Sequence, residues 1–231
     1  MPIAVLVSGR GSNLQALIDA CAAPDFPARI CLVLSNVASA GALARAERAG
    51  IPTAVLEHKA FAARAEFDGA LRAHIEAAGA ELVVLAGFMR LLTADFVAAF
   101  QGRLINIHPA LLPAFPGLRT HERALAAGVR FSGCTVHFVV ADMDAGPIIA
   151  QAAVPVHPDD TPNSLGLRVL DAERRCLPQA VRWFAEGRLS IEGPIVRVAG
   201  AKATPGTAIN PPAESSAGRP SPIPWGKDTK A

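Results

Sequence analysis

The sequence predicts an α/β protein with a mostly parallel sheet, helices on both faces of that sheet and an antiparallel hairpin toward the C-terminal end. Short apolar runs alternate with longer segments of helical periodicity, which is the pattern of repeated β–α–β units. Several of these runs are apolar at successive residues, as expected for strands that helices cover on both sides. Later in the chain two apolar runs follow each other around a short turn, which predicts the hairpin.

The first hundred or so residues are expected to alternate strictly between strands and helices. The predicted strands are Ile3–Val7, Ile30–Leu34, Thr53–Leu56, Leu82–Ala86 and Leu104–Ile107. The predicted helices lie at about Ser12–Ala22, Ala40–Ala49, Ala60–Ala78 and Ala94–Phe100. Serine is a favoured residue at the N-terminal cap of a helix, so Ser12 is expected to cap the first one.

The pattern changes after Gly133. Two apolar runs, Cys134–Val140 and Pro147–Val156, flank the turn Asp142-Met-Asp-Ala-Gly and predict a hairpin appended to the parallel sheet. A long helix from about Pro162 to Glu186 and a short hairpin near Leu189–Val198 are expected next. We assign residues 1–199 to one domain. Residues 200–231 are rich in Pro, Gly, Ser and Ala without an apolar period, so they are expected to form a disordered tail.

The composition bounds the kind of protein. The 231 residues are 51% hydrophobic with a formal net charge of +2, and no basic run predicts binding to nucleic acid or to an anionic membrane. The apolar N-terminus lacks a basic lead-in and runs directly into a glycine turn, so it is read as a first strand rather than a signal peptide. No C-x-x-C pair indicates a zinc site, and the cysteines are interpreted as core residues of a cytoplasmic protein. These cysteines are Cys21, Cys31, Cys134 and Cys176.

The first predicted strand leads straight into the turn Ser8-Gly-Arg-Gly-Ser-Asn13, and a helix follows. Glycines permit the tight turn, and the free N–H groups of the helix N-terminus then face an anion. Leu14 stands where a dinucleotide fingerprint has glycine or alanine, and the second strand ends without an acid for a ribose. The turn therefore favours a single phosphate over NAD, with a tight turn that binds no ligand as the alternative.

Polar side chains gather where the later strands end. Asn106 and His108 are two residues apart, so on a strand they leave from one face. An amide donates to a carbonyl oxygen, an imidazole moves a proton near neutral pH, and a nearby carboxylate favours the protonated imidazole. These groups suit acyl transfer to an amine. Asp142 and Asp144 both fit the acid role, and the residues alone do not decide between them. The remaining histidines, His137 included, are expected to be structural or surface residues.

Four segments in order carry a resemblance to the glycinamide ribonucleotide formyltransferases, a group of folate-dependent formyltransferases. It covers roughly Ile3 to Val198. The segments are Ser8-Gly-Arg-Gly-Ser-Asn-Leu-Gln-Ala-Leu, Val84-Leu-Ala-Gly-Phe-Met-Arg-Leu-Leu, Asn106-Ile-His-Pro-Ala-Leu-Leu-Pro, and Val136-His-Phe-Val through Asp144-Ala-Gly-Pro-Ile. The resemblance implies a Rossmann-like formyltransferase fold, 10-formyltetrahydrofolate as co-substrate without a metal, and glycinamide ribonucleotide as acceptor in purine biosynthesis. It implies no nucleic-acid or membrane partner and leaves a monomer or a homodimer open.

The resemblance also implies roles for single residues. Asn106 would hydrogen-bond the formyl oxygen, His108 would protonate or stabilise the oxyanion, and Asp144 rather than Asp142 would pair with His108. The substrate phosphate and ribose side would meet Gly11, Ser12, Asn13, Leu170, Asp171, Ala172 and Glu173. The folate pocket would comprise Arg64, Met89, Arg90, Leu91, Leu92, Asn106, Val140, Ala141, Asp142, Met143 and Asp144.

The sequence departs from the pattern of that family at a few positions near the expected site. These are Arg10, Ala110, Ala114, Ala145 and Leu170. Three rival functions share parts of the pattern. Formyltetrahydrofolate hydrolase is expected to carry a regulatory domain before this one, and methionyl-tRNA formyltransferase a C-terminal β-barrel after it. The sequence predicts neither module, so both interpretations are disfavoured. The third rival is a non-catalytic module that binds a phosphorylated metabolite at the glycine turn alone.

Overall fold

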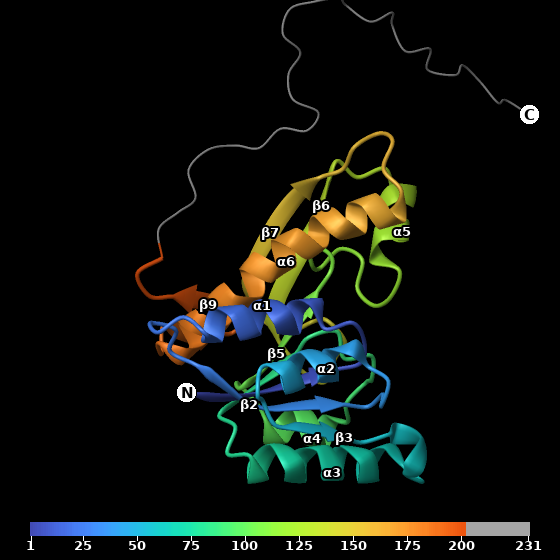
Figure 1. Ribbon diagram of the computed structural model, residues 1–231. Helices are drawn as coiled ribbons and strands as arrows, with labels where there is room; N and C mark the ends of the chain where they lie inside the picture. Colours follow the sequence, from blue (N-terminus) through green and yellow to red (C-terminus); the bar gives the residue numbers. More distant parts are fainter. Residues whose placement is uncertain (202–231) are drawn as a thin grey trace, which may run out of the picture.

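The computed structural model describes residues 1–201, which build a nine-stranded sheet (Figure 1). The predicted tail falls almost entirely outside these residues. The strands are β1 (Pro2–Val7), β2 (Arg29–Ser35), β3 (Thr53–Val55), β4 (Leu82–Leu85), β5 (Leu104–His108), β6 (Phe131–Phe138), β7 (Ile148–Pro155), β8 (Leu189–Glu192) and β9 (Ile195–Val198). Their order in the sheet is β3-β2-β1-β4-β5-β6-β7-β9-β8. Strands β1 to β5 pair in parallel, whereas β6 runs antiparallel to both β5 and β7. The predicted fold class is confirmed.

Helices cover both faces of the sheet, as the continuous apolar strands predict. They are α1 (Ser12–Cys21), α2 (Gly41–Arg48), α3 (Arg64–Ala77), α4 (Ala94–Ala99), α5 (Thr120–Ala126) and α6 (Pro162–Ala185). One core joins buried side chains of α1, α2, α5 and α6 to the sheet. A second core lies on the opposite face under α3 and α4. These two helices are at the bottom of Figure 1.

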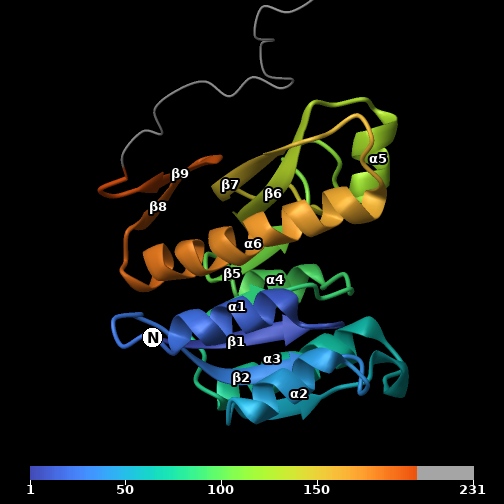
Figure 2. The same ribbon diagram turned by 45° about the horizontal axis from the view of Figure 1, so that its top comes forward.

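Helix α6 runs alongside α1 and covers β6 and β7 (Figure 2). A capping box fixes its start, because the Thr161 side chain accepts from the backbone N–H of Ser164 while Ser164 accepts from that of Thr161. Pro162 fits the first turn, where no backbone donor is needed. Its buried stripe, which includes Leu165 and Val169, holds the helix on the sheet. Glu173 on α6 is thereby brought within hydrogen-bond distance of Asn13 at the start of α1.

Three predicted boundaries are wrong. Ser12 is the first residue of α1 and not its cap, because Gly11 takes the cap position at φ 75°. Helix α3 begins at Arg64 because a 3₁₀ turn precedes it and Phe61 is extended, packing its ring 5.6 Å from that of Phe67. Strand β6 already begins before Gly133, where a Cβ atom would lie 2.0 Å from the carbonyl oxygen of Ala152 on β7.

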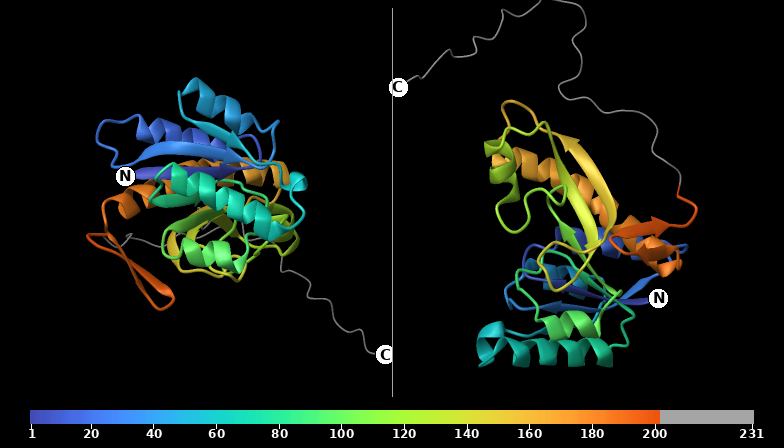
Figure 3. Two further views of the ribbon diagram at one scale, coloured as in Figure 1. Left: turned by 90° about the horizontal axis from the view of Figure 1, so that it is seen from below. Right: turned by 180° about the vertical axis from the view of Figure 1, so that it is seen from behind.

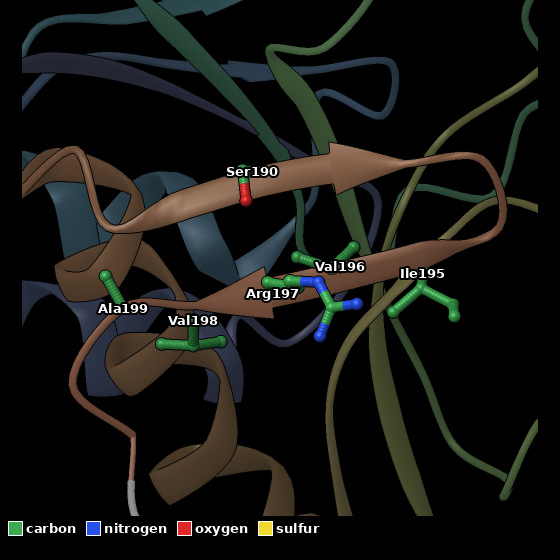
Figure 4. A pocket seen from close by; sticks show the side chains of 6 residues that line it. All are labelled: Ser190, Ile195, Val196, Arg197, Val198 and Ala199. Atoms are coloured by element: carbon green, nitrogen blue, oxygen red, sulfur yellow. The ribbon is translucent and has the colours of Figure 1, made fainter.

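The β8–β9 hairpin projects from one end of the sheet (Figure 3). A hollow beside it is shown in Figure 4, and it is lined by Ser190, Ile195, Val196, Arg197, Val198 and Ala199. None of the predicted catalytic or binding residues lines this hollow. Among the helices of residues 1–201, none has the length and apolar character that a membrane span requires.

Candidate active site

Strand β5 presents Asn106 and His108 on one face of the sheet. Ile105 and Ile107 alternate with them and enter the core under α1 and α6. Asn106 is half-buried, and only 4% of His108 is exposed. Asn106 lies in the middle of β5 and His108 at its end, on the strand that pairs in parallel with β4 and antiparallel with β6. The predicted pairing of these two side chains on one face is observed.

Asp144 lies in the turn that joins β6 to β7, and the fold brings it to His108. Its Oδ2 atom is 3.4 Å from Nδ1 of His108 and accepts a hydrogen bond of 2.8 Å from the backbone N–H of Gly117. Asp144 adopts a left-handed conformation at φ 55°, and 11% of its side chain is exposed. Asp142 is exposed and has no contact of this kind. Between the two aspartates, only Asp144 lies beside the imidazole.

Gly146 makes that turn possible. A Cβ atom at this position would stand 1.7 Å from the carbonyl oxygen of Phe138, which no side chain tolerates. The close approach lets β6 and β7 converge directly below the turn, with the Phe138 N–H donating to the Pro147 carbonyl at 2.9 Å. Glycine thereby fixes where the chain reverses, and the reversal sets the place of Asp144.

The loop after His108 folds back over its ring. Nε2 of His108 is 3.0 Å from the carbonyl oxygen of Phe115, which can only accept, so this nitrogen carries a proton. Thr135 on β6 holds the same loop, because its hydroxyl donates to the Ala110 carbonyl at 2.7 Å and accepts from the Leu112 N–H at 3.0 Å. The His108 ring is thus fixed between an aspartate and a backbone carbonyl.

His137 belongs to this cluster, although the sequence predicted a purely structural residue. Its Nε2 is 3.2 Å from Nδ2 of Asn106 and 3.8 Å from Oδ1 of Asp144. Burial lowers the pKa of His137. The available signal was Thr135-x-His137, a pair of polar residues two apart on a strand that runs antiparallel to Asn106-x-His108. Only the antiparallel pairing of β5 with β6 brings these two pairs together.

The glycine turn lies at the N-terminus of α1, next to α6. Gly11 packs so closely on α2 that a Cβ atom would be 2.7 Å from Cα of Ala42. Nδ2 of Asn13 donates to Oε2 of Glu173 at 2.8 Å, while Oδ1 of Asn13 is buried and has no hydrogen-bond partner within residues 1–201. Burial raises the pKa of Glu173, and the Asn13 hydrogen bond partly opposes this. The predicted residues 11–13 and Glu173, distant in sequence, are therefore neighbours.

Polar side chains shape this turn and leave a hollow beside it. The Arg45 guanidinium donates through Nε to the Arg10 carbonyl at 2.9 Å and through Nη1 to Gln15 at 3.1 Å. The hollow is lined by Ser12, Gln15, Ala16, Asp19, Arg45 and Arg174. Of the other predicted residues on α6, Leu170 is half-buried, Ala172 is buried, and Asp171 pairs with Arg175 at 2.9 Å. Leu170 and Asp171 thus do not reach α1 through any polar contact.

Ser8 connects the glycine turn to the predicted folate segment. Its hydroxyl accepts from the Met89 N–H at 2.7 Å and donates to Oδ1 of Asn36 at 2.6 Å. Apolar side chains are exposed in that segment and in the turn around Asp144. They are Met89, Leu91, Val140 and Met143, exposed by 66%, 57%, 37% and 56%. Arg64 is exposed at the start of α3, and Arg90 and Leu92 are half-buried.

The fold and this site define a class of protein. The family model described as formyl transferase matches residues 1–181. The chain belongs to the formyl transferase family. Its mixed sheet with a C-terminal antiparallel part matches the fold of solved formyltransferase structures.

Individual relatives show which members of the family this chain is similar to. The phosphoribosylglycinamide formyltransferases of Escherichia coli and Haemophilus influenzae are 47% and 45% identical over 191 and 190 residues, which is 83% and 82% of this chain and 90% of each relative. The human trifunctional purine biosynthetic protein adenosine-3 is 50% identical over 189 residues, 82% of this chain. The chain spans only 19% of the length of that human protein.

Solved structures agree with the sequence relatives. The crystal structure of glycinamide ribonucleotide transformylase 1 from Symbiobacterium toebii superposes with a TM-score of 0.84 at 50% identity, covering 86% of this chain and 93% of that one. Phosphoribosylglycinamide formyltransferase from Coxiella burnetii superposes with a TM-score of 0.82 at 46% identity, covering 87% and 94%. The predicted resemblance to this group is confirmed.

Proposed function

We propose that this chain transfers the formyl group of 10-formyltetrahydrofolate to the amine of glycinamide ribonucleotide, a step of purine biosynthesis. The observation that carries the proposal is the convergence of Asn106, His108 and Asp144, with the carboxylate 3.4 Å from the imidazole. The two bacterial relatives, each matched over 90% of its own length, bear the name of that activity. We assign the activity to residues 1–199, in a cytoplasmic monomer or homodimer.

The chemistry requires an oxyanion to be stabilised and a proton to be moved. The substrate amine attacks the formyl carbon as a free base, and the carbonyl electrons move to oxygen. Asn106 donates an N–H to that oxygen, and donors of this kind typically contribute about 10²–10³ in rate. The Nε2–H of His108, held by Phe115 in this structure, is the proton that the imidazole offers to the same oxygen.

Collapse of the intermediate completes the transfer. The bond between the formyl carbon and the folate nitrogen breaks, and that nitrogen gains the proton that the substrate amine loses. Asp144 stabilises the imidazolium form of His108 while the proton is in transit. The step needs no covalent enzyme intermediate and no metal, because the attacking amine is itself a sufficient nucleophile.

Two substrates have to meet in one cleft, and two regions are suited to hold them. The N–H groups of Gly11, Ser12 and Asn13 at the start of α1 bind the phosphate. Glu173 lies beside Asn13 at 2.8 Å and faces the ribose or amine side of the same substrate. The exposed apolar segment from Met89 to Leu92, with the turn from Val140 to Asp144 and Arg64, receives the folate. Holding both reactants in register supplies much of the remaining rate.

The test is a formyl-transfer assay with purified protein and 10-formyltetrahydrofolate, with and without glycinamide ribonucleotide. Formyl loss should require the ribonucleotide and should fall by about 10²–10⁴ in His108→Ala, as expected when a general acid is removed. His74→Ala, a change at an exposed histidine of α3, is the matched control and should keep full activity. Formate release without an acceptor would indicate a hydrolase, and no turnover at all would contradict the proposal.

A further inference from the structure

We propose that His137 is a positioning residue that sets the orientation of the Asn106 amide. As a neutral ring with its proton on Nδ1, His137 accepts one N–H of Asn106 and leaves the other N–H to meet the formyl oxygen. This inference rests on the proposed function for the role of Asn106, whereas the tautomer and the hydrogen bond are testable without it.

The sheet register makes the contact obligatory. Asn106 and His137 are directly opposite each other in the antiparallel pairing of β5 and β6, so their side chains leave from the same face. Only 1% of His137 is exposed, and the ring therefore has no solvent-facing alternative. Nδ2 of Asn106 and Nε2 of His137 are 3.2 Å apart, within hydrogen-bond distance.

The proton on the ring is assigned by its other partner. Nδ1 of His137 is 3.0 Å from the carbonyl oxygen of Phe138, and a carbonyl oxygen can only accept. Nδ1 therefore carries the proton. In a neutral ring Nε2 is then an acceptor, so the Asn106 atom that faces it has to be the amide nitrogen. An amide turned the other way would set two acceptors against each other.

The groups around His137 shift its pKa in opposite directions. Burial lowers its pKa, and so does the neighbouring His108. The Phe138 carbonyl and Asp144, whose Oδ1 is 3.8 Å from Nε2, favour the protonated ring. Desolvation is the largest of these influences, so the neutral ring dominates near neutral pH. Protonation at low pH would make Nε2 a donor, turn the Asn106 amide around and withdraw its N–H from the formyl oxygen.

The first experiment determines the tautomer of His137 directly by ¹⁵N NMR. The protein is labelled with ¹⁵N-histidine, and the His137 ring signals are assigned by their loss in His137→Gln. At pH 7.5 we expect Nε2 to resonate as an unprotonated ring nitrogen and Nδ1 as a protonated one. A protonated Nε2 at this pH would overturn the proposal. This result does not depend on turnover, so it stands even if the formyl-transfer assay fails.

The second experiment separates positioning from simple packing. In His137→Gln the side chain reaches the place of Nε2 and can still accept from Asn106. In His137→Asn the side chain reaches only the place of Nδ1, so it keeps a partner at Phe138 and loses Asn106. We expect His137→Asn to lower kcat by roughly 10–100-fold with little change in KM, and His137→Gln to retain most of kcat. Equal losses in the two variants would contradict a role through Asn106.

A double-mutant cycle tests whether His137 acts through Asn106. In an Asn106→Ala background, His137→Asn should lower kcat by less than about threefold, because the group that His137 positions is already gone. The same 10–100-fold loss in both backgrounds would show an independent role and overturn the proposal. Thermal unfolding of each variant is measured alongside, and the Gln and Asn substitutions, both polar and of similar size, keep the comparison valid if both are equally destabilised.

Discussion

Two regions, one after β1 and one on β5 and β6, differ in which chemical groups form them. The cluster of Asn106, His108, His137 and Asp144 consists of buried and half-buried side chains that contact one another across β5, β6 and the following turn. The glycine turn at residues 8–13 instead offers backbone N–H groups, and its shape depends on how closely Gly11 approaches α2. The first region should therefore respond to changes in side-chain chemistry, and the second to changes in backbone shape.

The largest effect is expected in the side-chain cluster. Asn106→Ala removes the proposed donor to the formyl oxygen and should lower kcat by about 10²–10³ while KM for both substrates changes little. Steady-state kinetics on folded protein checks this. Ser12→Ala is the matched change in the glycine turn. It removes a side chain but keeps the N–H, and it should alter KM for the ribonucleotide by less than about threefold. Comparable losses in the two variants would erase the distinction between the regions.

The glycine turn should fail when its shape is changed. In Gly11→Ala the new methyl group meets Ala42 at 2.7 Å and the residue has to keep φ 75°, which typically costs about 1–3 kcal/mol of stability. We expect KM for the phosphorylated substrate to rise about tenfold, because the N–H groups no longer converge. Urea unfolding and steady-state kinetics measure both effects. Gly9→Ala, where a Cβ atom meets nothing within 4 Å, is the control and should be nearly neutral.

Removal of the exposed positive charge of Arg10 in the glycine turn should have a smaller effect. Arg10→Gly should raise KM for the ribonucleotide by about two- to fivefold and leave KM for the folate unchanged, since an exposed charge contributes only about 0.5–1 kcal/mol. Arg10→Lys keeps the charge and should restore most of the affinity. An unchanged KM in Arg10→Gly would show that the backbone alone holds the phosphate.

The smallest effect concerns stability and pH at Glu173. Burial raises the pKa of this carboxyl in the folded state, so the folded protein binds its proton more tightly than the unfolded chain does. The resulting stabilisation is complete below the unfolded pKa of a glutamate and is lost as pH rises through the folded value. Glu173→Gln keeps an acceptor for Asn13 and should remove this dependence. Urea titrations at pH 4.5 and 7.5 should show wild type losing more stability than the variant across that range.

The elements that were predictable are those whose signal is local. Continuous apolar strands such as Leu82–Leu85 and the long stripe of α6 follow from periodicity alone. Asn106 and His108 could be paired because two residues on one strand share a face, and the roles suggested for them came from the resemblance to a known family. The boundaries that failed at Ser12 and Gly133 depend on close contacts of Gly11 with α2 and of Gly133 with β7, which no local pattern contains. The start of α3 at Arg64 follows instead from the 3₁₀ turn before it and the packing of Phe61 on Phe67.

The sequence by itself determined the fold class, the order of strands and helices, the glycine turn and the Asn106–His108 pair. Each depends on side-chain periodicity or on residues close together in the chain. The resemblance to a known family already implied Asp144 rather than Asp142 as the partner of His108, and the structure places its carboxylate 3.4 Å from the ring. Only the tertiary structure decided that His137 faces Asn106 and that Glu173 meets Asn13. These contacts depend on strand register, on a turn that Gly146 permits and on the packing of α6 against α1, and such long-range geometry is fixed only when the whole sheet is assembled.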